Sequence, residues 1–217
     1  MIVEVLTAHH GRVPLVAKGV RRPRSALRGL LQPFQPLMIN WFGQGELRTL
    51  RTAEWQGGIP LLQGHALFCG FYLNELLMLL LKRDDPHEAL FLEYKQALKK
   101  LTHVELFEPV LRVFELALLR ELGYAPSLEH EVVSGEPVDP HRTYRFDPEN
   151  GAVQWNGSTG PDVVKFKGKT LLDMAISNYD DPGTLAQGKQ LMRILLSHQL
   201  GHQDLHSRRI IQELLLS

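Results

Sequence analysis

The sequence of 217 residues contains a single cysteine, Cys69. One cysteine excludes a disulfide within the chain, a cysteine-rich zinc module and an iron–sulfur cluster, and it fits a reducing compartment. Met1–Glu4 lacks the basic and apolar segments of a signal peptide. The longest apolar stretch, Ala66–Leu81, is short for a membrane span and is interrupted by Asn74 and Glu75. We therefore expect a cytoplasmic protein without a membrane partner.

Catalytic and nucleotide-binding motifs are also missing, since no G-x-S-x-G, H-E-x-x-H or G-x-G-x-x-G is present. Gly168-Lys169-Thr170 has the spelling of the end of a phosphate-binding loop, but a valine stands where that motif begins. His198, His202 and His206 are candidate metal ligands on one helix face, although Gly201 should end the helix before the third. The alternative is a solvated helix end. We expect that the protein is not an enzyme and binds no cofactor. A metal-dependent enzyme that uses these histidines is the less favoured alternative.

Net charge is absent from the whole chain but not from its parts. The 24 lysines and arginines balance 24 aspartates and glutamates. Residues 1–56, however, contain eight cations against three glutamates, a net charge of +5, which leaves −5 for the remainder. This asymmetry indicates that one end of the chain meets a polyanion.

Most of these cations fall on one loop between expected strands, and two more fall on a later strand. They are Lys18, Arg21, Arg22, Arg24 and Arg28 on the loop, and Arg48 and Arg51 on the strand. Cations on a mobile turn suit contacts to phosphates, which carry charge but no sequence information. The alternative is a solvated loop that binds nothing.

Apolar and polar residues alternate over much of residues 1–57, which is typical of short β-strands. The pattern predicts strands around Ile2, Val3 and Val5, around Val13, Leu15 and Val16, around Leu37, Ile39 and Trp41, and around Leu47 and Leu50. Glycines separate these strands, and Gly43-Gln44-Gly45 predicts a hairpin. Short strands with turns between them predict a small antiparallel barrel, with a domain boundary near Gly57-Gly58.

Three aromatic residues in this region have two interpretations. Trp41, Phe42 and Trp55 are candidate platforms on which nucleobases stack. A small barrel also needs large side chains in its interior, and this favours the core for each of them.

After Pro60 the apolar spacing becomes helical, so we expect an α-helical domain over residues 58–217 and an α+β multidomain chain. Asp85, Pro86 and Glu88 predict a capped helix start. Prolines and glycines predict an irregular insertion at about residues 124–168, with one hairpin pairing 143–146 and 152–155. The other expected helices are at 66–81, 109–123, around 171, 185–200 and 207–216.

Two helical segments are candidate binding sites. Arg112 precedes an apolar face of Phe114 and Leu118, so a groove could take an apolar peptide end while the guanidinium takes its carboxylate. The alternative is a core helix whose Arg112 pairs with Glu108 or Glu115.

The second candidate is Ser207-Arg208-Arg209, where two arginines in a first helical turn oppose the helix dipole. An anion could compensate them there. Alternatively, the helix begins elsewhere, or Asp204 and Glu213 offset the charge.

Taken together, these segments resemble the RecO family of bacterial DNA repair and recombination-mediator proteins. The matching stretches follow the family's order over nearly the whole chain. They are Gly11–Val13 with Val16–Gly19, Leu31–Phe34, Gly45–Glu54, Tyr72–Leu77, Arg112–Glu115 with Leu122–Tyr124, Ser134–Val138, and Leu205–Arg208.

The resemblance implies an N-terminal OB-fold β-barrel, an α-helical C-terminal domain and no catalytic turnover. It also implies a nucleoid-associated protein that binds single- and double-stranded DNA and anneals complementary strands. Its implied partners are the single-stranded DNA-binding protein, bound through its acidic tail, and RecR, with which it acts so that RecA can load. The loop cations would then be DNA contacts, joined by Arg48 and Arg51 on the strand. Arg112 would meet the tail's terminal carboxylate near Phe114 and Leu118. A protein-interaction scaffold that does not bind DNA is the remaining alternative.

The sequence departs from the family pattern in two places. Some members carry a four-cysteine zinc site, which a chain with only Cys69 cannot form, so it resembles the zinc-free subtype. The family also has a stretch of about twenty residues, including the first barrel strand, before the segment equivalent to Ile2–Val5. We therefore expect either a start placed too late or an open, incomplete barrel.

Overall fold

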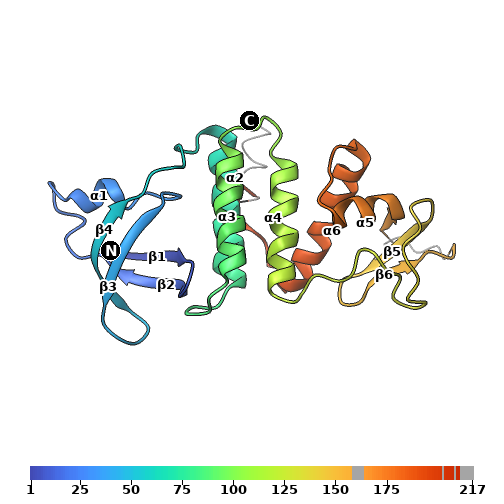
Figure 1. The fold of residues 1–217 in the computed structure, drawn as a ribbon, viewed down its shortest axis with the longest axis horizontal. Coiled ribbons are helices and arrows are strands. Elements are labelled where there is room, and N and C mark those ends of the chain that lie inside the picture. Colours follow the sequence, from blue (N-terminus) through green and yellow to red (C-terminus); the bar gives the residue numbers. More distant parts are fainter. Residues whose placement is uncertain (158–163, 202, 208, 211–217) are drawn as a thin grey trace. The chain divides into compact units, whose positions relative to one another are not determined.

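The computed structural model describes residues 1–157, 164–201, 203–207, 209 and 210. It divides into two compact units (Figure 1). The first contains residues 1–107 together with 205–217, and the second contains residues 108–204. The expected boundary near residue 57 separates the sheet from the helices inside the first unit, and as a domain boundary it stays a prediction.

Four strands form the N-terminal sheet, as the alternation predicted. They are β1 (Ile2–Thr7), β2 (Gly11–Val16), β3 (Leu37–Phe42) and β4 (Arg48–Trp55), in the order β1-β2-β4-β3. The β1–β2 and β3–β4 pairs are antiparallel hairpins, whereas β2 and β4 are parallel. Within the described residues β1 and β3 do not pair with each other, so the sheet is open and not a closed barrel.

The interior of this sheet is small. Its buried residues are Val13, Leu15, Ala17, Val20 and Leu50. A short helix that the sequence did not predict, α1 (Ala26–Leu30), contacts β4, and Leu27 and Leu31 pack against this core. The loop after β2 is therefore tied to the core at both of its ends.

Two helices complete the described core of the first unit, α2 (Gly64–Leu80) and α3 (Glu88–Leu101), which pack on each other. The expected cap at Asp85 is wrong, because His87 precedes the first turn of α3. The backbone of Asp85 is instead packed against Gly11, where an added Cβ would lie 2.1 Å from the Asp85 carbonyl oxygen. The N–H of Asp84 also donates to the carbonyl of Arg12 (3.1 Å), so tertiary contacts delay the helix start.

The second unit combines helices with a small sheet. Its helices are α4 (Glu108–Glu121), α5 (Gly168–Ala175) and α6 (Pro182–Gln199), and α6 packs on both others. Gly123 and Gly201 follow α4 and α6 in left-handed conformations, as their helix-stopping positions predicted. The expected hairpin is confirmed as β5 (Thr143–Asp147) and β6 (Gly151–Gln154), and the unpredicted β7 (Lys165–Lys167) joins it.

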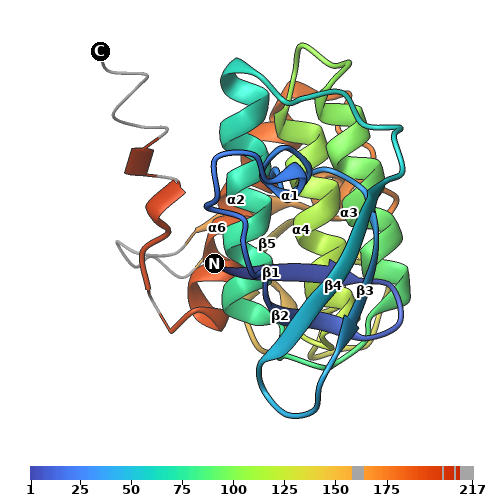
Figure 2. The same ribbon diagram turned by 90° about the vertical axis from the view of Figure 1, so that its left-hand side faces the viewer.

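The last expected helix, residues 207–216, lies largely outside the described residues. His206 and Ser207 form a helical turn beside α2, seen in red in Figure 2. Among the helices in the described ranges, none has both the length and the apolarity that crossing a membrane requires.

Candidate functional site

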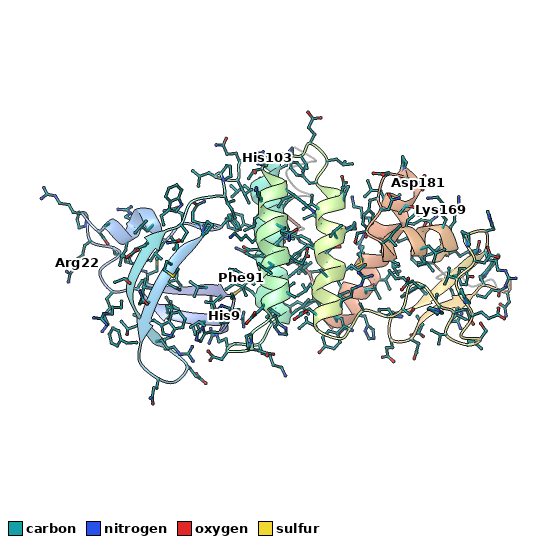
Figure 3. All side chains as sticks on the ribbon, viewed as in Figure 1. His9, Arg22, Phe91, His103, Lys169 and Asp181 are labelled. Carbon is teal, nitrogen blue, oxygen red and sulfur yellow. The ribbon has the colours of Figure 1, made fainter. Side chains whose placement is uncertain are left out.

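The basic loop after β2 is anchored by its apolar residues and exposes its cations. Val20 is buried in the core of the sheet, and Gly19 turns the chain with a φ of 75°. The N–H of Arg22 donates to the Gly19 carbonyl at 3.0 Å, so the loop has a defined turn. Its cationic side chains are exposed, and the labelled Arg22 extends away from the ribbon in Figure 3.

The cations of this loop are available for a ligand. In the described part of the chain none of them forms an ion pair; they are Lys18, Arg21, Arg22, Arg24 and, on α1, Arg28. A hollow of about 540 Å³ lies at the loop, and its lining includes Val16, Val20 and Pro23 as well as Lys18, Arg21 and Arg22. An anchored loop with uncompensated cations around an apolar floor can hold an anionic polymer through its phosphates.

The two arginines of β4 differ from each other. Arg48 donates to Asp84 (Nη1 to Oδ1, 2.7 Å), and its side chain is only 20% exposed. Its charge is thus engaged in holding β4 to the segment before α3. Arg51 is exposed, because the register shifts from Asn40 opposite Thr52 to Trp41 opposite Leu50 and leaves Arg51 in a bulge.

Other polar contacts join the sheet to the same segment. Arg12 donates to the Met78 carbonyl at 2.6 Å, and Arg83 pairs with Glu4. At the β1–β2 turn, His9 lies 2.7 Å from Glu88 at the start of α3. The sheet and the two helices of the first unit are therefore fixed to each other by side-chain contacts as well as by packing.

The aromatic residues do not all lie where the barrel argument placed them. Trp41 packs against the core and meets His10 edge to face, with ring centroids 5.1 Å apart. Phe42 is 56% exposed and Trp55 is 60% exposed, so the expectation of a core position is wrong for these two. Phe42 faces outward because side chains alternate along β3, and Trp55 stands at the last position of β4.

In α4, the expected peptide groove is a packed interior in this structure. Arg112 is 6% exposed, Phe114 is 1% exposed and Leu118 is fully buried. Arg112 pairs with Glu115 one turn away, which is the arrangement of the core-helix alternative. Tyr179 lies near this pair, and burial raises the pKa of its hydroxyl to about 12. A ligand for Arg112 would need this packing to open, so a role for these residues in partner binding stays a prediction.

The candidate anion site at Ser207 already has an anion, and that anion belongs to the protein. Both the N–H and the hydroxyl of Ser207 donate to one carboxylate oxygen of Glu75 on α2, and the N–H of His206 donates to the other at 2.8 Å. Burial of Glu75 favours its neutral form, but these hydrogen bonds outweigh it and lower the pKa of the carboxyl. Arg208 lies outside the described residues, and the N–H of Arg209 donates to Leu205.

Sequence reasoning noted Glu75 only as an interruption of an apolar run. The available signal was the cost of a carboxylate in a largely buried helix, which indicates that a donor must meet it. The identity of that donor could not be read from the sequence, because 132 residues separate Glu75 from Ser207.

The C-terminal histidines are not gathered in the described residues. His198 lies 3.4 Å from Glu149, His206 is held at Glu75 through its backbone, and His202 lies outside the described residues. No group of three or more candidate metal ligands occurs in the ranges that the structure describes. At the start of α5, Lys169 pairs with Asp173 and the Thr170 hydroxyl donates to Gln187.

Comparison with known proteins covers nearly the whole chain. Residues 1–58 match the family model described as "Recombination protein O N terminal", and residues 61–209 match "Recombination protein O C terminal". The chain is similar to the DNA repair protein RecO of Azoarcus sp. (strain BH72), at 54% identity over 217 residues, which cover 99% of this chain and 89% of the relative. It is also similar to the proteins of the same name from Nitrosospira multiformis, at 51% identity with 98% and 88% covered, and Aromatoleum aromaticum, at 50% with 99% and 89% covered.

Proposed function

This chain belongs to the RecO family of DNA repair proteins, and from that premise we propose how it engages DNA and its partners. Family membership makes it a non-enzymatic mediator of DNA repair and recombination. We propose that its open N-terminal sheet is an OB-type module that binds single- and double-stranded DNA and promotes annealing. We also propose that it belongs to the zinc-free subtype, because a chain with one cysteine cannot form a four-cysteine zinc site.

The observation that carries the DNA-binding proposal is the basic loop. Its cations are exposed and lack ion-pair partners among the described residues, while buried Val20 fixes the turn that presents them. Lys18, Arg21, Arg22, Arg24 and Arg28 would contact phosphates, and exposed Arg51 would extend the same surface. Such binding is largely independent of sequence and weakens steeply with salt, because each contact releases condensed counterions. Arg48 already pairs with Asp84, so we propose that it holds β4 to the segment before α3 and does not bind a phosphate.

The partner proposals rest on the family. The single-stranded DNA-binding protein would be engaged through its acidic tail at Arg112, Phe114 and Leu118, after the packing around the Arg112–Glu115 pair opens. RecR would act with the protein so that RecA can load. Binding to DNA and to the protein that covers it raises the local concentration of complementary strands, which favours annealing without catalysis.

The experiment that tests DNA binding is a salt series of fluorescence anisotropy with a labelled single-stranded oligonucleotide. Arg21→Ala, Arg22→Ala and Arg24→Ala together should reduce the slope of log affinity against log salt by about 2, which corresponds to three lost phosphate contacts. A matched control removes three exposed lysines of α3, Lys95, Lys99 and Lys100, and should leave the slope unchanged.

An equal change in both triple variants would show that the loop has no special role. Absence of binding by the unaltered protein would overturn DNA binding by this chain and favour the protein-interaction alternative.

A further inference from the structure

Trp55 combines high exposure with a fixed orientation. The residue is 60% exposed, and its indole Nε1–H donates to the side-chain oxygen of Gln35 at 3.1 Å. The benzo ring rests beside Gly57, where an added Cβ would lie 3.6–3.9 Å from three ring carbons. A tryptophan held in one orientation and left open to water therefore presents a flat, preset π-face on which a ligand can stack.

The backbone around Trp55 reinforces that orientation. Trp55 is opposite Leu37 in the β3–β4 ladder, and the N–H of Gln56 donates to the Pro36 carbonyl at 3.0 Å. The ring thus stands at the last rung of a paired hairpin. Because its rotamer is set before any ligand arrives, stacking on it costs little side-chain entropy.

Charge identifies the chemistry of the occupant. The ring belongs to a region of 56 residues with a net charge of +5, whose loop cations suit phosphates. In nucleic-acid-binding proteins, aromatic rings beside cationic backbone contacts receive bases, since every base has a flat π-face. We propose that Trp55 is a stacking platform for an unpaired nucleobase, so that the protein holds single strands by a base as well as by phosphates.

This inference rests on the proposed function and deepens it by naming the form of DNA that the site prefers. A base inside a duplex already stacks on its neighbours, so it cannot lie on Trp55 unless it is flipped out. Phosphate contacts on the basic loop serve both forms of DNA. Stacking on Trp55 adds affinity for single strands alone, and that contribution depends little on salt.

The test compares two single-stranded probes of equal length and charge, oligothymidine and an abasic oligonucleotide that has the same backbone without bases. Trp55→Ala should weaken oligothymidine binding by roughly 5- to 150-fold, the equivalent of about 1–3 kcal/mol for one stacked base. Binding of the abasic probe and of a duplex should stay within about twofold. Trp55→Phe, which keeps a π-face, should recover most of the oligothymidine affinity, whereas Trp55→Leu should not.

A second readout reports on the ring directly. Trp41→Phe with Trp155→Phe leaves Trp55 as the sole tryptophan of the three in the chain, and oligothymidine should quench its fluorescence while the abasic probe should not. The matched control keeps only Trp155, which packs under Lys165 at 3.9 Å in the second unit, and should show no quenching.

The possible results separate the two proposals. Equal losses for both probes in Trp55→Ala, or binding without quenching of Trp55, would overturn the stacking role while DNA binding stands. If the unaltered protein binds neither oligothymidine, the abasic probe nor the duplex, both the proposed function and this inference fall.

Discussion

The contact between Glu75 and Ser207 leads to a quantitative prediction about stability. One carboxylate accepts three hydrogen bonds from a segment that is 131 and 132 residues away in the chain. A hydrogen bond to a charged group contributes about 1.5–3 kcal/mol, and leaving a buried donor unpaired costs a further amount. Glu75→Gln keeps the shape of the side chain but places an amide NH₂ against at least one of these donors. We expect it to lower the free energy of unfolding by about 2–3 kcal/mol.

The assay is urea denaturation of a double-mutant cycle. Ser207→Ala removes only the hydroxyl donor, so the coupling energy between Glu75→Gln and Ser207→Ala should be about 1 kcal/mol. Glu105→Gln, a change at an exposed glutamate between α3 and α4, is the matched control and should alter stability by less than about 0.5 kcal/mol. A loss in Glu75→Gln no larger than that of the control, or a coupling near zero, would refute the reasoning.

The pH dependence of the same contact has a definite sign. The hydrogen bonds from Ser207 and His206 outweigh burial and lower the pKa of Glu75 below its ordinary value of 4.5. A carboxyl group with a lowered pKa in the folded state stabilises the fold at pH values above its unfolded pKa. That contribution is lost as the pH falls through the folded pKa. The stability difference between the unaltered protein and Glu75→Gln should therefore be constant near neutrality and shrink in acid below about pH 4.5.

Two further predictions concern the packing of each unit. Gly11→Ala should destabilise the first unit by more than about 2 kcal/mol in thermal unfolding. The reason is that φ at Gly11 is +63° and the new Cβ would lie 2.1 Å from the Asp85 carbonyl oxygen. An unchanged melting temperature would contradict that contact. Tyr179→Phe should leave stability unchanged or raise it by up to about 1 kcal/mol, because the buried hydroxyl has no hydrogen-bond partner in the described residues. A clear loss of stability would show that the hydroxyl does form a hydrogen bond.

Local patterns in the sequence predicted most of the secondary structure. Alternation located the strands β1 to β4, and the glycines at 43 and 45 located the β3–β4 hairpin. Helix α1 was missed because a five-residue helix has too few positions to show a period. The cap at Asp85 failed for a different reason: its local signals were sound, but the approach of Gly11 fixed that backbone in another conformation.

The candidate site was less predictable than the fold, because the charge of a residue does not reveal its partner. The loop cations and Arg48 look alike in sequence, yet Asp84 engages only Arg48 among them. Exposure is equally hidden. Trp41 and Trp55 both end up on strands of one hairpin, but Trp41 packs on the core whereas Trp55 stands at the last rung. Pairing with distant residues and the depth of the core decide these cases, and neither has a local signature.

The composition of the first unit from two distant parts of the chain sets an order for its folding during synthesis. Strands β1 to β4 and helices α2 and α3 leave the ribosome first, followed by the whole of the second unit, and only then by residues 205–207. Until that moment the carboxylate of Glu75 on α2 lacks the hydrogen bonds that Ser207 donates to it, while the second unit can already fold. A nascent chain that stalls before residue 205 would therefore carry a finished second unit and an unfinished first unit, the state in which quality-control proteases would find it.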